Sequence, residues 1–181
     1  MYTNNRKMQH TYNEFMQLVA SRHSVRAYSP ETLTEEEINA VLEAARLAPS
    51  ACNRQPWKFY VVTNEPMRHA MLAKSRPGFL DAPVLIVAVG LHAEAWHRPA
   101  DGKDHTDVDV SIAVEHMCLA AEAAGLDTCW ICSFDTEAVR NALNLAADQE
   151  PIALLPLGRK AESDAPAKIR KDTAQIVEYV R

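Results

Sequence analysis

The hydrophobic residues of this chain follow two spacings, one typical of helices and one typical of strands. Helical spacing extends over residues 11–20, 34–48, 65–74, 108–125 and 136–145. Short apolar runs of strand length occupy residues 57–62, 82–90, 127–134 and 152–158. The pattern therefore predicts a chain in which helices and strands are mixed throughout.

Local signals at the ends of these segments support the boundaries. Thr34 and Glu37 have the spacing of a capping box at the start of the second helix, and Pro49 ends that helix. Asp135 is expected to cap the helix that follows it. The run 82–90 is almost wholly apolar, which indicates a central strand covered on both faces.

No internal repeat or linker divides the chain, and 181 residues are enough for one domain with a full hydrophobic core. We therefore expect a single domain over residues 1–181. Residues 1–10 are polar and are expected to form a frayed N-terminus. Residues 92–107 are rich in histidine and charge, and we interpret them as a polar loop that could act as a lid.

Composition excludes some classes of function. The net charge of −5 argues against a general nucleic-acid binder, although a local basic pocket remains compatible with it. No apolar run approaches the roughly 20 residues that span a bilayer, and no secretory start is visible, so no membrane partner is expected. The four cysteines lack the pattern of a disulfide-stapled scaffold, and we interpret them as reduced thiols in a cytoplasmic protein.

The first candidate site is the sequence SRHSVRAY at residues 21–28. Arg22, His23, Ser24 and Arg26 bring two guanidiniums, an imidazole and a hydroxyl within five residues. Such a segment can wrap an anion, because the guanidinium fork matches phosphate oxygens. A solvated basic turn is about equally compatible with these residues alone.

A second polar cluster lies between a predicted helix and a predicted strand. Pro49 stops the helix, and Ser50, Asn53 and Gln55 then present side chains that both donate and accept hydrogen bonds. Taken alone, this segment is most simply an ordinary loop. The presence of two polar clusters in one chain favours a shared binding site.

Motifs that would carry other chemistry are absent or weak. The chain has no glycine-rich nucleotide motif, no nucleophile elbow and no zinc-protease motif, and we expect no metal. Cys129 and Cys132 have CxxC spacing, but a strand would point them to opposite faces, so we interpret them as structural. The chemistry is therefore expected to come from a bound organic cofactor. Lys168 and Arg170 belong either to a solubilising tail or to a phosphate site.

Four segments resemble motifs of the nitroreductase family of FMN-dependent oxidoreductases, in the same order. Residues 21–28 are similar to R-[RH]-S-x-[RK]-x-[FY], and APSACNRQPWKF at 48–59 is similar to A-P-S-x-x-N-x-Q-P-W-x-[FY]. AAEAAGLDTCWI at 120–131 is similar to A-A-E-x-x-G-L-x-x-C-W-[IL]. LPLG at 155–158 resembles the closing strand of the family, and the resemblance covers nearly the whole chain.

The resemblance implies an α+β fold, a three-layer sandwich whose central, mostly antiparallel sheet is flanked by helices, in an intertwined homodimer. It also implies FMN at the subunit interface. One subunit would contribute Arg22, His23, Ser24, Arg26, Trp130, Ile131, Cys132, Ser133, Lys168 and Arg170. The other subunit would contribute Pro49, Ser50, Asn53 and Gln55.

The chain departs from the family pattern at two places. Residues 75–78 stand where the family's pocket can include an amide and a lysine. Cys132 stands where many members have glycine. These departures concern the geometry and redox tuning of the site and leave FMN binding as the expectation.

The activity implied by the resemblance is hydride transfer from NAD(P)H through FMN to a nitroaromatic, quinone or similar electron-poor acceptor, by a ping-pong mechanism. No side chain is needed as an acid or a base, so no catalytic residue is assigned. Two alternatives remain at this point. One is a flavin-binding or regulatory protein with little turnover, and the other is a flavin enzyme of the dehydrogenase, dehalogenase or flavin destructase type.

Overall fold

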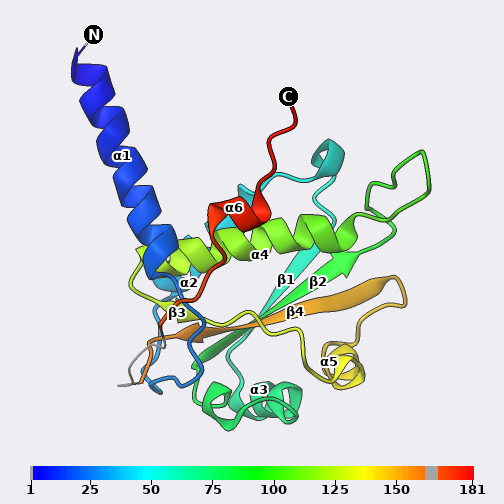
Figure 1. Ribbon diagram of the computed structural model, residues 1–181. Helices are drawn as coiled ribbons and strands as arrows, with labels where there is room; N and C mark the ends of the chain where they lie inside the picture. The colour runs from blue at the N-terminus through cyan, green and yellow to red at the C-terminus, as the bar shows by residue number, and fades with distance from the viewer. Residues whose placement is uncertain (1, 162–166) are drawn as a thin grey trace.

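A computed structural model describes residues 2–161 and 167–181 of the chain (Figure 1). Four strands form one sheet in the order β1-β2-β4-β3, and each of these pairings is antiparallel. The strands are β1 (Trp57–Val62), β2 (Val84–Leu91), β3 (Asp127–Thr128) and β4 (Gln149–Gly158). The mostly antiparallel sheet of the predicted α+β fold is confirmed.

Helices cover both faces of this sheet, so the domain has three layers (Figure 1). One face carries α2 (Glu35–Arg46) and α4 (Thr106–Ala123), and the other carries α3 (Glu65–Leu72) and α5 (Thr136–Leu143). Successive side chains of a strand point to opposite faces. In β2, Ile86 and Ala88 therefore join the core under α2 and α4, whereas Leu85 and Val87 join the core under α3 and α5. The prediction of a central strand buried on both faces is confirmed.

The predicted helix caps are present. The Thr34 hydroxyl accepts a hydrogen bond from the Glu37 N–H at 3.2 Å, and the Glu37 carboxylate accepts one from the Thr34 N–H at 2.8 Å. This reciprocal capping box satisfies two donors that the first turn of α2 would otherwise leave free. The Asp135 carboxylate accepts a hydrogen bond from the Ala138 N–H at 3.1 Å and caps α5 in the same way.

The strand predicted over residues 127–134 is wrong beyond Thr128. β3 ends there, and pairing with β4 resumes only at an isolated bridge between Ile131 and Leu154. The register places Pro156 of β4 opposite Cys129. Because proline has no N–H to donate, the ladder is interrupted at this point. The residues that follow are thus free to leave the sheet and line a cavity.

The N-terminal helix is longer than the spacing predicts. α1 extends over Tyr2–Ser21, so residues 2–10 are helical, whereas fraying of the terminus stays a prediction; residue 1 lies outside the described residues. Its sequence contains neither proline nor glycine, so nothing stops the helix from extending past the apolar stripe. α1 projects from the body of the domain, and its Tyr12 and Phe15 are more than half exposed (Figure 1).

The polar segment predicted over residues 92–107 ends at His105, because Thr106 begins α4. His92 ties its start to two carboxylates, with Nδ1 at 2.7 Å from Asp104 and Nε2 at 2.8 Å from Glu150. The segment is therefore anchored at its base, and its role as a lid stays a prediction. Among the described residues, no helix combines the length and apolar content required to cross a bilayer.

Candidate functional site

The first polar cluster lies along β3 in an extended segment that follows α1. Ser24 forms a parallel bridge with Thr128, and the Val25 N–H donates to the Thr128 carbonyl at 3.0 Å. Val25 and Tyr28 are buried, and the Tyr28 hydroxyl lies 3.2 Å from the Val25 carbonyl oxygen. Successive side chains of an extended segment point to opposite sides, so the side chain of Arg26, next to buried Val25, is exposed.

Arg26 lines a cavity of about 640 Å³ together with residues from two other parts of the chain. One wall is the segment Trp130–Ser133, and the opposite wall includes Lys74 and Arg76 from the turn before β2. The approach is close, because a Cβ on Gly78 would lie 2.2 Å from the Arg26 carbonyl oxygen. Glycine at this position therefore allows the turn to pack directly against the Arg26 backbone.

Three basic side chains line this cavity, and Lys74 among them pairs with the Asp135 carboxylate at 2.6 Å. Burial raises the pKa of the Cys129 thiol, whereas Arg26, Arg76 and Arg22 act in the opposite direction through their charges. Both Cys129 and Cys132 line the cavity, but Cys129 is buried and Cys132 is exposed, and the two form no disulfide. All four cysteines are free, as the sequence suggested.

A second basic region lies where the C-terminal segment crosses the end of α1. The Lys168 ammonium donates hydrogen bonds to the carbonyls of Val19 and Ala20. Desolvation lowers the pKa of Lys168, and the charges of Arg22 and Arg170 lower it further. The fold therefore brings Lys168 close to Arg22 although the two lie far apart in sequence.

The second polar cluster forms a tight loop with an unusual backbone. Cys52, Asn53 and Gln55 have φ angles of 51°, 53° and 52°, in the left-handed region that costs about 1–2 kcal/mol for a residue with a side chain. The Ser50 hydroxyl accepts a hydrogen bond from the Gln55 N–H at 2.8 Å. Strained backbone of this kind is frequent at ligand-binding sites.

Asp109 anchors this loop from α4. Its carboxylate is almost fully buried, and Oδ1 accepts a hydrogen bond from the Ala51 N–H at 2.9 Å. Its Oδ2 atom is buried and has no hydrogen-bond partner among the described residues. Nothing in the spacing of the sequence pointed to Asp109, because the contact joins segments that are far apart along the chain.

The two polar clusters do not meet within one chain. Ala51 is bound to Asp109 near the start of α4, whereas His23 lies beside Glu122 near its end. Asp109 and Glu122 are about 20 Å apart along the helix, at roughly 1.5 Å per residue. The cavity beside Arg26 contains no residue of the second cluster in its lining.

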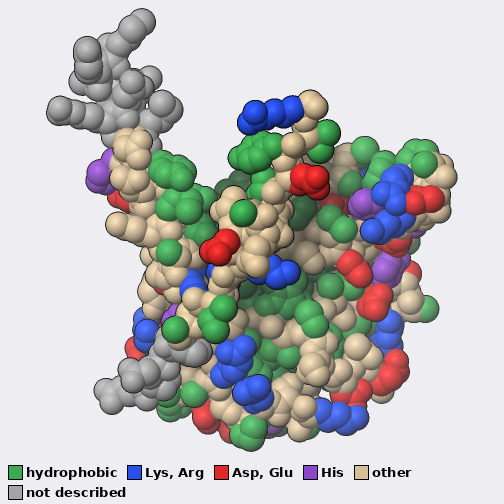
Figure 2. Space-filling view, in the orientation of Figure 1, with side chains coloured by type: hydrophobic (Ala, Val, Ile, Leu, Met, Phe, Trp, Pro, Cys, Tyr) green, Lys and Arg blue, Asp and Glu red, His purple; other side chains and the backbone are tan. Residues whose placement is uncertain are grey.

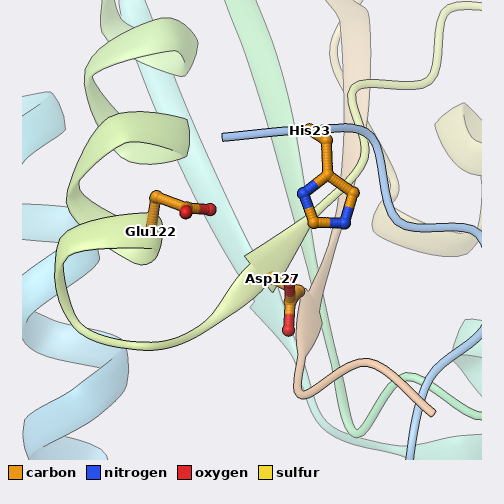
Figure 3. A group of neighbouring side chains, drawn as sticks. All are labelled: His23, Glu122 and Asp127. Carbon is orange, nitrogen blue, oxygen red and sulfur yellow. The ribbon is translucent and has the colours of Figure 1, made fainter. Parts of the chain in front are cut away.

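His23 is surrounded by carboxylates. Figure 3 shows its ring close to the side chains of Glu122 and Asp127, and the ligand atoms of the three residues lie within 4.8 Å of one another. The Nδ1 atom of His23 is 3.2 Å from the Ser21 carbonyl oxygen. An imidazole with two carboxylates could hold a divalent cation. Sequence reasoning assigned His23 but missed both acidic neighbours.

Among the predicted residues, the structure thus unites Arg26 with Trp130, Ile131, Cys132 and Ser133, and it unites Arg22 with Lys168. It leaves Pro49, Ser50, Asn53 and Gln55 in a separate loop, and it places Arg170 on the exposed C-terminal segment. Lys74 and Arg76 were missed. The sequence did contain a clue to them: Lys74 and Arg76 are two basic residues separated by one position, as Lys168 and Arg170 are.

The donor set fits a flat, anionic organic group such as FMN. Guanidinium and ammonium groups bind phosphate oxygens, and Arg22 with Lys168 supplies both. The indole N–H of Trp130 is buried and has no hydrogen-bond partner in the described part of the chain, which leaves a donor for a ligand atom. The lining of the cavity beside Trp130 and Ile131 combines apolar side chains with Arg26, Lys74 and Arg76.

Comparison with known proteins identifies the family to which this fold belongs. The sequence profile described as "Nitroreductase family" matches residues 19–76 and 64–159, so the chain belongs to the nitroreductase family. The structure resembles a nitroreductase family protein from Clostridium difficile 630, with a TM-score of 0.81 and 35% sequence identity. The match covers 90% of this chain and 95% of that one.

Two relatives bear on activity. A protein of Archaeoglobus fulgidus named putative NADH dehydrogenase/NAD(P)H nitroreductase is 31% identical, over 80% of this chain and 84% of that protein. Iodotyrosine deiodinase 1 of Sus scrofa is 29% identical, over 91% of this chain and 68% of that protein.

Proposed function

We propose that this protein is an FMN-dependent oxidoreductase that takes hydride from NAD(P)H and reduces a nitroaromatic, quinone or similar electron-poor acceptor by a ping-pong mechanism. The observation that carries the proposal is the cavity in which Arg26, Lys74 and Arg76 face the segment Trp130–Ser133. Membership of the nitroreductase family and the NAD(P)H nitroreductase name of the Archaeoglobus fulgidus relative support it.

The residues divide into two groups around the proposed cofactor. Arg22 and Lys168 would hold the phosphate, because they are the cations that the fold brings together at the end of α1. Arg26, Lys74 and Arg76 would lie along the ring, where their positive charge favours the electron-rich reduced form. When bound, FMN supplies the redox chemistry by accepting hydride and passing electrons to the acceptor. No side chain is assigned as an acid or a base.

A second subunit is part of the proposal because, within one chain, the polar loop around Ser50 lies away from the basic residues. A homodimer would bring Ser50, Asn53 and Gln55 of one subunit to the basic cluster of the other. Exposed apolar side chains support such an association: Tyr12, Phe15, Met16 and Val19 on α1, and Ile169, Ile176, Val177, Tyr179 and Val180 in the C-terminal segment. Monomeric surfaces rarely expose this much contiguous apolar area.

Figure 2 shows these hydrophobic side chains on α1 and on the C-terminal segment, with a recess below α6 (Thr173–Ile176). Lys and Arg side chains border the recess, as expected of a surface that receives both an apolar partner and an anionic ligand (Figure 2). The dimer would therefore complete the site rather than only stabilise the fold.

The experiment that tests the function is the absorption spectrum of the purified protein, followed by anaerobic addition of NADH or NADPH. We expect a flavin spectrum that bleaches on addition and returns when a quinone is supplied. Replacing Arg22 by alanine should weaken FMN binding roughly tenfold or more, because a charge-assisted contact is lost. The matched control is Arg46→Ala, since Arg46 is exposed and pairs with Glu43 on α2. No flavin after incubation with FMN would contradict the proposal.

The dimer is tested separately by analytical ultracentrifugation. Phe15→Asp should shift the protein towards monomer, because a charge would replace an exposed apolar side chain of the proposed interface. Met67→Asp on α3 is the matched control, since Met67 is also exposed but lies on another surface. Equal association of both variants would contradict an interface at α1.

A second candidate function is reductive dehalogenation at the same site. The observation that favours it is the likeness to iodotyrosine deiodinase 1 over most of this chain. Release of iodide from an iodinated phenol by the reduced protein would support this activity. A protein that oxidises NAD(P)H with a quinone but releases no iodide would exclude it.

A further inference from the structure

A cavity of about 480 Å³ lies away from the proposed flavin residues, none of which lines it. It opens where β1 ends and β2 begins, at the edge of the sheet formed by β1. Its walls come from the segment before α2, from the first turns of α3 and from the residues that lead into β2. Cavities of this size accommodate small organic ligands.

Arg68 of α3 is the dominant polar group of this cavity. Only 7% of Arg68 is exposed, and its Nη1 atom donates to the carbonyls of Leu80 and Ala82. Nε and Nη2 donate to no described residue, and Nε is buried. A guanidinium nitrogen without a protein partner can donate a charge-assisted hydrogen bond to a carboxylate.

The burial of Arg68 has an energetic consequence. Desolvation lowers the pKa of the guanidinium, and the charge of Glu65 acts in the opposite direction. No ion pair of Arg68 occurs among the residues that the structure describes. A buried donor without a partner destabilises the folded state, so a ligand that supplies an acceptor would recover part of this cost.

The same cavity also carries negative charge. Glu65 and Asp81 line it, and both are exposed, so water screens them more than it screens Arg68. The remaining lining is largely apolar, with Leu33, Ile38 and Val84 on the walls. The ligand that complements both signs and the walls has one anionic group, one cationic group and an apolar body.

We propose that this cavity binds a small zwitterion with an apolar side chain, such as an apolar α-amino acid, with its carboxylate on Arg68. The ammonium group faces Glu65 and Asp81, and the side chain packs against the apolar walls. Because the cavity is separate from the flavin site, this proposal does not depend on the proposed oxidoreductase activity.

The test is isothermal titration of the purified protein, with its cofactor content unchanged, against L-leucine. Two analogues that lack one charge each, 4-methylpentanoate and 3-methylbutylamine, are titrated in parallel. We expect L-leucine to bind roughly tenfold more tightly than either analogue, because each analogue leaves one side of the cavity without a partner. No detectable leucine binding, or equal binding of all three, would overturn the proposal.

Variants locate the binding. Arg68→Met should weaken leucine binding roughly tenfold or more, whereas Arg46→Met, a change at an exposed arginine of α2, should not. If Arg68→Met does not fold, Thr32→Trp replaces it, because Thr32 is an exposed residue of the lining and an indole there would fill the cavity. Leucine binding that survives Thr32→Trp unchanged would place the ligand elsewhere and refute the assignment.

Discussion

The Oδ1 atom of Asp109 accepts a hydrogen bond from the Ala51 N–H at 2.9 Å, and this contact fixes the polar loop against the start of α4. The loop contains three residues with positive φ, so its conformation is held by its contacts and not by its intrinsic preference. Among the residues that the structure describes, none bonds to Oδ2 of Asp109. One oxygen of the carboxylate therefore accounts for the anchoring.

Two substitutions of Asp109 should distinguish the stabilising effect of its hydrogen-bond acceptor from that of its charge. Asp109→Ala leaves the Ala51 N–H unpaired and should lower the free energy of unfolding by about 1–3 kcal/mol. Asp109→Asn keeps an oxygen acceptor and removes a buried charge, so its stability should stay close to that of the wild type. Urea unfolding of both variants measures the difference. If Asp109→Asn lost as much stability as Asp109→Ala, the charge and not the hydrogen bond would be the anchor.

Gly78 should not tolerate a side chain. A Cβ at this position would lie 2.2 Å from the Arg26 carbonyl oxygen, which is backbone and cannot rotate away. We expect Gly78→Ala to lower the free energy of unfolding by about 1–3 kcal/mol and to reduce flavin retention, because the cavity wall must shift.

Gly125→Ala provides the comparison for Gly78→Ala. Gly125 has a φ of +71° and open space around its Cβ position, so alanine there should cost about 1–2 kcal/mol through the backbone alone. Thermal unfolding and flavin content are measured for both variants. Equal flavin loss in both would show that global stability, and not the contact with Arg26, controls retention.

The four cysteines should react with a thiol reagent in two classes. Cys52 and Cys132 are exposed, whereas Cys118 and Cys129 are buried. Burial raises the pKa of Cys118 to about 11, which leaves little of the reactive thiolate near neutral pH. Mass spectrometry after brief alkylation of the native protein should find labels on the exposed pair alone. Rapid labelling of Cys118 would show that the core around α4 opens readily.

The link between His92 and its two carboxylates should make stability depend on pH. The hydrogen bond to Asp104 raises the pKa of His92, burial opposes this shift, and Glu150 adds to it. The protonated form is therefore favoured in the folded state. Its contribution is complete below the unfolded pKa of about 6.5 and is lost as the pH rises through the higher folded value.

Asp104 affects the stability of the fold at acidic pH. Burial raises its pKa, but hydrogen bonds from Thr106 and from His92 outweigh that effect and hold the pKa at about 2. Its contribution is present above about pH 3.9 and is lost as the pH falls towards that lower value.

The urea midpoint measured against pH tests this link. His92→Gln should remove the decline of stability above about pH 6.5, whereas His10→Gln, an exposed histidine on α1, should leave the decline in place. An unchanged decline in His92→Gln would assign it to another group.

Local sequence determined most of the helices and strands of this protein. The capping box at Thr34, the cap at Asp135 and the buried strand around Ile86 follow from interactions within a few residues, so spacing alone predicts them. Element ends were less certain, because β3 stops where Pro156 of a neighbouring strand lacks an N–H.

Tertiary structure alone decided which of these residues come together. It placed Lys74 and Arg76 beside Arg26 and separated the loop around Ser50 from the basic cluster. These outcomes depend on chain segments that are distant in sequence and on the packing of α4 against the sheet. Sequence spacing describes neighbours along one helix or strand, whereas such long-range contacts are set by how the elements pack, so the sequence could propose candidate residues but could not show which of them lie together.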